Sequence, residues 1–189
     1  MKKLQLFKSD EMRPFTQFAQ IKNGNVVCVT SYLILHLPTE DVFGCRVEGE
    51  WYMDRKMWGL LKFPSAKLIS VEAPMVKNLY AGTELRLLSP AEYSATYGNY
   101  PDWESVVPAR DKPLAACERI ALNAELYKQV CDAWGLTTPP RINLYGPDRA
   151  MILDQRDQKG WALLMPVAIS DDIESGFYNP APAEANDLL

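Results

Sequence analysis

The 189-residue sequence lacks the features that mark several large classes of protein. It has no apolar run close to the roughly 18 residues that a membrane-spanning helix needs. The basic N-terminal residues 1–10 lack the apolar stretch of a signal peptide. There is also no glycine-rich phosphate loop, nucleophile elbow or zinc-binding HExxH helix. We therefore expect a cytoplasmic protein that does not enter membranes, needs no metal or cofactor and is not an enzyme.

Histidine and cysteine are scarce as well. The one histidine, His36, stands at the end of an expected strand, which favours a structural role. No two cysteines have the spacing of a zinc knuckle or a redox motif, so reduced, buried thiols are the simplest interpretation. The four are Cys28, Cys45, Cys117 and Cys131. One alternative stays open, a small hydrolase that pairs one of these cysteines with His36 as nucleophile and base.

Positive charge is in short supply. The chain has 20 Lys and Arg residues against 24 Asp and Glu residues, and this net charge of −4 excludes a strongly basic nucleic-acid-binding protein. The acidic excess lies after Val167, where five acidic residues and no Lys or Arg occur. Residues 1–167 are therefore close to neutral, and residues 168–189 are expected to form an acidic, flexible C-terminal tail.

Short strands are expected along most of the chain. β-Branched and aromatic residues over 17–37 flank the turn Asn23-Gly24-Asn25 and predict a hairpin whose second arm continues to Pro38. Further strands are expected over 67–72, 83–88, 141–145, 150–155 and 161–167. The stretch 89–114, which is rich in Tyr, Pro, Gly and Asp, is expected to be a connection.

Two helices are expected, over 54–63 and 124–134. Asp54 and Asn123 are suitable N-cap residues, and Gly135 follows the last turn of the second helix. Each helix has an apolar stripe at helical spacing. The stripes are Met57, Trp58 and Leu61 in the first helix, and Leu126, Tyr127, Val130 and Trp134 in the second.

The order strand, capped helix, strands occurs twice, in halves of about 1–90 and 100–167. Each half alone buries too little apolar surface to be stable, so we expect one α+β domain over 1–167. Its two pseudo-symmetric halves would each have a helix packed on antiparallel sheet, with the two helices side by side on one face.

Several segments, in order along the chain, resemble the bacterial replicative sliding clamp, the beta subunit of the DNA polymerase holoenzyme. Residues 100–108 (Y-P-D-W-E-S-V-V-P) resemble its F-P-D-Y-x-x-V-[IL]-P segment, and 161–167 (W-A-L-L-M-P-V) resemble its closing strand Y-V-V-M-P-M. Residues 120–126 (I-A-L-N-A-E-L) resemble the entry to a clamp helix, and 12–15 (M-R-P-F) and 23–30 (N-G-N-V-V-C-V-T) its R-P strand and following hairpin. The resemblance covers 12–167 in patches and implies a single DNA-clamp-like module.

The resemblance also implies a groove for a partner peptide. In clamps, the P-D-Y segment and the M-P of the closing strand border an apolar pocket that takes short peptides. The matching candidates here are Pro101, Met165 and Pro166, with Thr30, Leu33, Leu35 and Val107 as further walls. The Asp, Gly, His and Arg of the clamp pattern A-T-D-G-H-R-L are absent from residues 29–35 (V-T-S-Y-L-I-L), and the alternative is that these residues are core.

Residues 185–189 (A-N-D-L-L) are a candidate ligand for such a groove, because they weakly resemble the acidic and apolar ends of clamp-binding peptides. Since this segment is tethered to the chain, its effective concentration would raise a weak affinity. It would engage either the protein's own groove or that of another clamp.

Clamps also surround DNA with helices whose exposed faces are basic. The candidate DNA-facing residues here are Arg55, Lys56, Lys62 and Lys128. Acidic residues on the same helices nearly balance them, so DNA binding is expected to be weak or indirect. The leading hypothesis is a non-enzymatic sliding-clamp-like protein with a protein or peptide partner, acting in protein interaction or as a DNA-replication accessory factor. The alternative is a true small clamp subunit, a homo-oligomer that forms a DNA-encircling ring.

Overall fold

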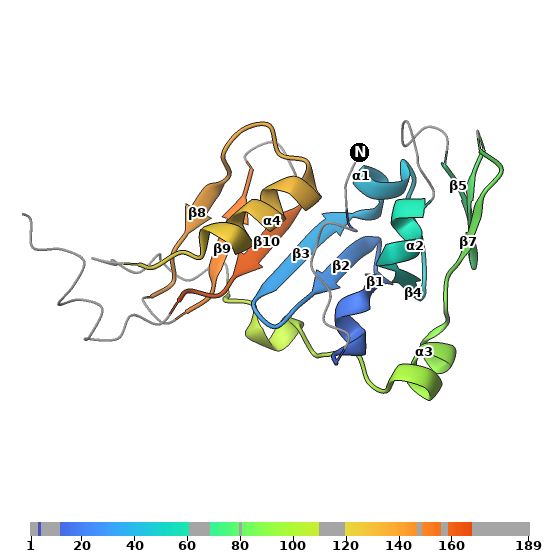
Figure 1. The fold of residues 1–189 in the computed structure, drawn as a ribbon, viewed down its shortest axis with the longest axis horizontal. Coiled ribbons are helices and arrows are strands. Elements are labelled where there is room, and N and C mark those ends of the chain that lie inside the picture. The colour runs from blue at the N-terminus through green and yellow to red at the C-terminus, as the bar shows by residue number, and fades with distance from the viewer. Residues whose placement is uncertain are drawn as a thin grey trace, which may run out of the picture.

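The computed structural model describes Leu4 and residues 12–60, 69–79, 81–109, 120–146, 149–155 and 159–167 (Figure 1). These residues form a seven-stranded sheet in the order β4-β1-β2-β3-β10-β9-β8 and a three-stranded sheet in the order β5-β6-β7. All strand pairs are antiparallel. The expected tail over 168–189, Leu61, Lys62 and Cys117 lie outside the described residues.

The strands and helices have the following bounds. The strands are β1 Phe18–Lys22, β2 Asn25–Val29, β3 Leu33–Pro38, β4 Glu50–Asp54, β5 Ile69–Glu72, β6 Met75–Asn78, β7 Glu84–Arg86, β8 Arg141–Asn143, β9 Met151–Asp154 and β10 Trp161–Leu164. The α-helices are α1 Thr39–Phe43, α2 Arg55–Leu60, α3 Pro90–Tyr97 and α4 Ala124–Trp134, and two 3-10 helices are η2 Pro14–Gln17 and η4 Glu104–Val106.

The expected hairpin forms, but its second arm is two strands. At the β1–β2 turn Asn23 and Gly24 have φ of 53° and 76°, a left-handed conformation that these two residue types tolerate best. The prediction that the second arm continues to Pro38 is wrong. Thr30 N donates to Leu33 O at 2.8 Å, and Thr30 Oγ1 accepts from Leu33 N at 3.1 Å. These bonds close a turn after β2, and β3 returns antiparallel to it.

Both expected helices are present with their expected caps. Asn123 Oδ1 accepts from Glu125 N at 3.0 Å and from Leu126 N at 3.2 Å at the start of α4. Asp54 Oδ1 accepts from Lys56 N at 2.7 Å at the start of α2. The stripe expected on the first helix needs one correction, because Met57 is 39% exposed while Trp58 is buried. Arg55, three residues before Trp58 and on the same face of the helix, is also a buried side chain of α2.

The stretch expected to be a connection contains a helix, α3. Ser89 and Glu92 form a capping box at its start, with Ser89 Oγ accepting from Glu92 N and Glu92 Oε2 accepting from Ser89 N. Pro90 fits the first helical position, where no N–H is needed. These hydrogen bonds, and the Arg86 guanidinium, lower the pKa of Glu92 to about 2. The sequence S-P-A-E therefore carried a helix signal that the aromatic and glycine content of the region obscured.

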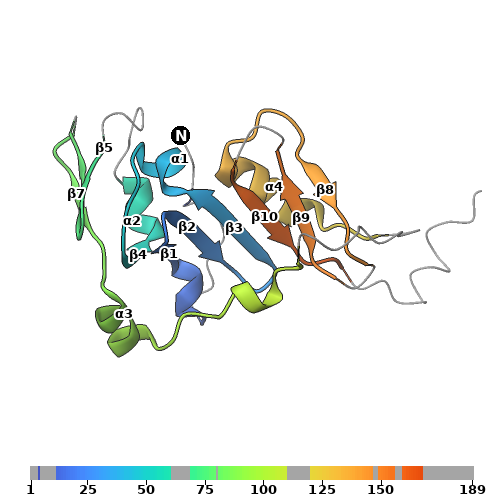
Figure 2. The ribbon, with the colours of Figure 1, turned by 180° about the vertical axis from the view of Figure 1, so that it is seen from behind.

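The helices α1, α2 and α4 cover one face of the large sheet (Figures 1 and 2). The core between them contains Phe43, Trp58 and Trp134, together with alternate residues of the strands such as Leu33 and Leu35. Helix α2 lies against β4, at one edge, whereas α4 lies against β3 and β10. The expected α+β class with helices on antiparallel sheet is confirmed.

One pairing joins the two parts of the chain into a single sheet. Strand β3 of the first part pairs with β10 of the second, with Trp161 opposite His36 and Leu164 opposite Leu33. The first part contributes four strands to this sheet and the second contributes three, and β5 to β7 of the first part form the separate small sheet, so the described parts are unequal. The division at about 1–90 and 100–167, and the pseudo-symmetry of the halves, stay predictions.

Candidate functional site

The face of the large sheet opposite the helices carries a second apolar cluster. Its buried members are Val27, Val29, Ile34, Ala150, Ile152, Trp161 and Leu163. Helix α3 packs on the β1–β4 end of this face, where Tyr93 contacts Phe18 and Tyr52. The segment over 98–109, which includes η4, also lies on this face, and Tyr100, Trp103 and Val107 of that segment pack on the cluster together with Met165. We call this surface the second face.

Three contacts hold the 98–109 segment on the second face. The Trp103 indole donates from Nε1 to Gln20 Oε1 at 2.9 Å. The Tyr100 hydroxyl lies 3.3 Å from the carbonyl oxygens of Phe18 and Val27, and its burial raises the pKa of Tyr100 well above the usual value. The Trp103 ring also lies 5.8 Å from His36 at a steep angle. The segment is thus fixed to the sheet through the two aromatic residues at its centre.

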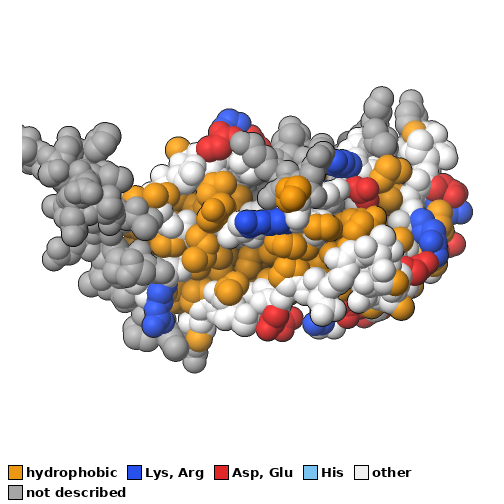
Figure 3. Space-filling model, turned by 60° about the horizontal axis from the view of Figure 1, so that its bottom comes forward, with side chains coloured by type: hydrophobic (Ala, Val, Ile, Leu, Met, Phe, Trp, Pro, Cys, Tyr) orange, Lys and Arg blue, Asp and Glu red, His pale blue; other side chains and the backbone are white. Residues whose placement is uncertain are grey.

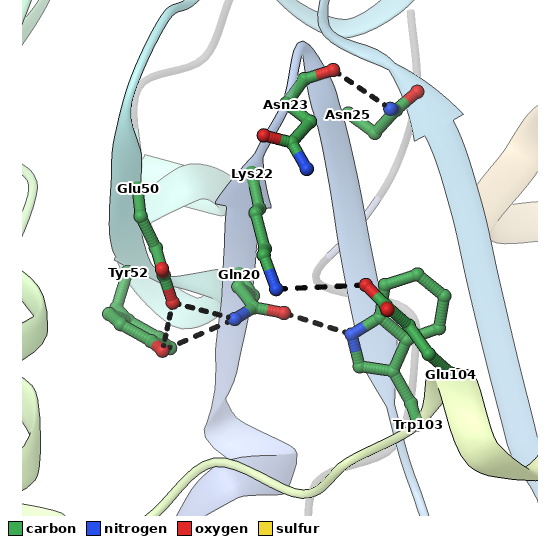
Figure 4. A network of polar contacts seen from close by, with 8 residues as sticks. All are labelled: Gln20, Lys22, Asn23, Asn25, Glu50, Tyr52, Trp103 and Glu104. Carbon is green, nitrogen blue, oxygen red and sulfur yellow. Dashed lines mark hydrogen bonds and ion pairs between the residues drawn. The ribbon is translucent and has the colours of Figure 1, made fainter.

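Where this segment meets β1 and β4, the second face has a pocket of about 420 Å³. A row of polar contacts forms its floor (Figure 4). Glu50 Oε1 accepts from Gln20 Nε2 at 2.9 Å and from the Tyr52 hydroxyl at 2.8 Å. Burial, followed by this hydrogen bond to Glu50, raises the pKa of Tyr52 to about 12. Lys22 Nζ lies 3.6 Å from Glu104 Oε1 across the mouth.

The structure brings some of the expected groove residues together and separates others. Val107 and Met165 pack on the same cluster of the second face, Pro101 lines the neighbouring pocket, and Pro166 follows Met165. Thr30 closes the β2–β3 turn next to them, because Met165 N donates to Tyr32 O at 2.9 Å. These residues stay candidates for a groove.

Leu33 and Leu35 need a correction. Both are buried in the core beneath the helices, at 1% and 0% exposure, and cannot form walls of a groove on the second face. Side chains alternate between the faces along a strand, and in β3 it is Ile34 that belongs to the second-face cluster. The prediction therefore assigned the side chains of β3 to the wrong faces, because the alternation was shifted by one residue.

The described DNA-facing candidates, Arg55, Lys56 and Lys128, do not form a basic surface, and Lys62 lies outside the described residues. Arg55 is 2% exposed, so it cannot contact phosphates; it is the first residue of α2, and its side chain is buried near Cys28 and Tyr100. Lys128 is exposed but pairs with Asp132 one helical turn later. Lys56 is the remaining described candidate on an exposed helix surface.

Among the described cysteines, which do not include Cys117, the geometry gives no support to a cysteine–histidine hydrolase. Val27 is the β2 partner of His36, so Cys28 points to the opposite face of the sheet from His36. Burial raises the pKa of Cys28 to about 11, and also raises the pKa of Cys45 and Cys131, whereas a nucleophile needs a lowered value. Within the described ranges no three His, Cys, Asp or Glu residues are grouped as metal ligands. No described helix has the length and apolar content to span a membrane.

The polar residues of the pocket were not predicted from the sequence. Gln20 and Lys22 on β1, and Glu50 and Tyr52 on β4, alternate with Ile21 and Trp51, which face the helices. Such alternation signals a sheet face that is not covered by helices. It could have drawn attention to this face, although not to the segment 80 residues later that completes the pocket.

This architecture is that of a DNA sliding clamp. The DNA polymerase III beta subunit of Thermotoga maritima aligns with 89% of this chain and 63% of its own, with a TM-score of 0.55 and 10% identity. The beta subunit of Streptococcus pyogenes DNA polymerase aligns with 89% of this chain and 65% of its own, with a TM-score of 0.54 and 10% identity. The sliding clamp of Bacillus subtilis aligns with 89% of this chain and 62% of its own, with a TM-score of 0.53 and 13% identity. The clamp-like module expected from the sequence is thereby confirmed as the fold.

The match leaves part of each clamp uncovered, because the chain spans less than two thirds of the length of these clamps. No protein-family model matches the sequence. No curated protein is significantly similar to it either. The likeness at 10–13% identity therefore establishes the fold alone.

A buried hydroxyl beside the pocket gives a test of the described packing. Tyr93 of α3 is 1% exposed, stacks on Tyr52 at 4.1 Å between ring centroids, and its hydroxyl has no hydrogen-bond partner among the described residues. Tyr93→Phe should leave the free energy of unfolding unchanged or raise it by about 1 kcal/mol, because a buried unpaired hydroxyl is costly. The matched variant Tyr52→Phe loses the bond to Glu50 and should cost about 1 kcal/mol. Urea unfolding measures both, and an equal loss in the two variants would contradict the packing.

Proposed function

We propose that this protein is a non-enzymatic clamp-fold module that binds a protein or peptide partner and acts as an accessory factor in DNA replication. The second face is the surface that binds the partner in this proposal. The protein does not act as a ring that moves along DNA. The observation that carries the proposal is the charge on the side of the sheet covered by helices.

The described helices on that side carry more acidic than basic side chains, where a DNA-tracking clamp would be basic. The ionisable residues of α1, α2 and α4 that are at least partly exposed are two lysines and four carboxylates. They are Lys56 and Lys128, and Glu40, Asp41, Glu125 and Asp132. Sequence-independent affinity for DNA comes from neutralising phosphates with Lys and Arg. A surface with this balance repels a duplex at close range.

The second face, in contrast, has the surface of a binding site for another protein. In the view of Figure 3, hydrophobic side chains spread as a broad band across the molecule, with a Lys or Arg side chain within it and carboxylates along its lower margin. Tyr32, Val106 and Val167 are 61%, 54% and 42% exposed, and the first and last lie beside Met165. Contiguous exposed apolar surface on a protein typically marks an interaction site.

The ring alternative has one observation in its favour. Strand β8 is the last strand of the large sheet, pairs only with β9 among the described residues, and presents Ile142 at 42% exposure. An open strand edge can pair with another chain. Size-exclusion chromatography with light scattering distinguishes the two proposals, since a ring needs several copies of this chain.

A DNA titration tests the main proposal directly. We expect fluorescence anisotropy with a labelled duplex to show binding no tighter than about 10⁻⁴ M at about 0.15 M salt, because the helix side lacks a basic surface. Lys56→Glu should weaken the residual binding at low salt no more than Lys77→Glu, which changes a lysine of the small sheet. Tight binding at physiological salt that Lys56→Glu selectively abolishes would refute the proposal and favour the ring.

A further inference from the structure

The pocket of the second face has walls of aromatic rings. Tyr52 and Tyr93 lie against each other as a stack, with 16° between their planes, and Tyr100 meets Tyr93 edge-on at 5.8 Å. Trp103 forms the opposite side. The volume of about 420 Å³ is in the range of sites that bind small ligands or single large side chains. Aromatic faces attract cations through their quadrupole.

The charged groups around these rings are mainly acidic. Glu50, Asp102 and Glu104 line the pocket, with Lys22 as the one basic lining residue. Lys22 pairs with Glu104 at 3.6 Å, and no described Lys or Arg forms an ion pair with Glu50 or Asp102. The pocket is therefore complementary to a positively charged group.

Glu50 is held in position to accept such a group. Its Oε1 atom accepts both hydrogen bonds, from Gln20 and Tyr52, and Gln20 is itself fixed by the Trp103 indole. Among the described residues, Oε2 of Glu50 accepts no hydrogen bond. One carboxylate oxygen is thus oriented by the protein while the other is available at the floor of the pocket (Figure 4).

We propose that this pocket binds an arginine side chain of a partner protein, the guanidinium on Glu50 and the alkyl chain between the aromatic rings. Arginine fits better than lysine because its planar guanidinium can stack on an aromatic ring while it donates a charge-assisted hydrogen bond to Oε2 of Glu50. Residues 168–189 of this chain contain no Lys or Arg, so its own tail is not the occupant. The inference rests on the proposed function in taking the partner to be a protein.

The continuity of the surface supports a protein as the source of the arginine. Trp103 both lines the pocket and packs on the second-face cluster with Val107 and Met165. A partner segment with its arginine in the pocket would therefore place the residues next to that arginine over the apolar cluster of the second face. A free polyamine in the pocket carries no neighbouring residues to place over that surface.

Titration of the full-length protein with capped arginine (N-acetyl-arginine amide), followed by NMR of the Trp103 indole N–H, tests the pocket. We expect a dissociation constant on the order of 1 mM. Capped citrulline, which has the same shape without the charge, should bind at least about fivefold more weakly. Glu50→Gln should weaken the binding of capped arginine by at least about fivefold. The control is Glu48, an exposed carboxylate that pairs with Arg46, and Glu48→Gln should not change this binding.

Two results would overturn the inference. One is equal binding of capped arginine and capped citrulline, and the other is spermidine binding more tightly than capped arginine, which would assign the pocket to a free polyamine. If Glu50→Gln unfolds, Asp102→Asn on the exposed rim tests the acidic charge of the pocket instead, and should weaken the binding of capped arginine but not that of capped citrulline. The titration does not involve the apolar band, so its failure leaves the proposed function standing, and failure of peptide binding to the band leaves the pocket result intact.

Discussion

Replacing Trp134 with alanine should lower the free energy of unfolding by about 3–5 kcal/mol, a large part of the 5–15 kcal/mol that a domain usually has. Trp134 is fully buried near the end of α4 and packs where β3 and β10 meet beneath that helix. A Cβ built at Gly160 would lie 3.2 Å from Trp134 Cζ2 and 2.8 Å from Leu37 Cδ2, so the indole is closely packed against the backbone at Gly160. Thermal unfolding should show a melting temperature lower by about 6–20 °C.

The control for Trp134→Ala is Met57→Ala on α2. Met57 is 39% exposed although it occupies a helix of the same face, so its truncation should change the free energy of unfolding by no more than about 0.5 kcal/mol. Comparable losses in the two variants would mean that α4 is not packed on the sheet as described.

Trp103→Ala should reduce partner binding by about 30-fold or more, the second large effect that we expect. A tryptophan at the centre of an interface typically contributes 2 kcal/mol or more, and Trp103 belongs both to the pocket and to the apolar surface beside it. The probe for the apolar surface is a labelled synthetic peptide of residues 185–189, added to a chain that ends at residue 184 so that its own segment does not compete. Fluorescence anisotropy measures the affinity.

Trp51→Ala is the matched control for Trp103→Ala. Trp51 is also a half-buried tryptophan whose indole donates one hydrogen bond, to Glu48 O at 2.9 Å, but it faces the helix side of the sheet. Trp51→Ala should lower the free energy of unfolding about as much as Trp103→Ala does, and should still bind the peptide of residues 185–189. If the peptide binds neither the unmodified chain nor the variants, the C-terminal segment is not a ligand of this face. Equal loss of binding in both variants would place the site elsewhere.

Local signals explain what could be predicted from the sequence. Asn123, Gly135 and a stripe of apolar residues determine α4 through contacts within one helix, and Asn23-Gly24 determines the first hairpin in the same way. The capping box at Ser89 and Glu92 was an equally local signal, and α3 could have been predicted from it.

The remaining features depend on contacts between distant parts of the chain. A shift of one residue exchanges the two faces of a strand, so the sequence of β3 alone could not show that Ile34, and not Leu33 or Leu35, faces the 98–109 segment. Arg55 follows an N-cap on an amphipathic helix and would ordinarily be exposed, yet its neighbours bury it. The pocket joins Gln20, Glu50 and Trp103, which no periodicity relates.

The pairing of β3 with β10 determines when during synthesis the fold can be completed. His36 and Trp161 are more than one hundred residues apart in the chain, and contacts of such separation slow folding. On the ribosome, β1 to β4 emerge first, with the apolar strand L-I-L-H-L-P as an open edge. Until β10 arrives, that edge can pair with any other nascent chain. Pairing with β10 therefore protects the newly made protein against aggregation through the open edge of β3.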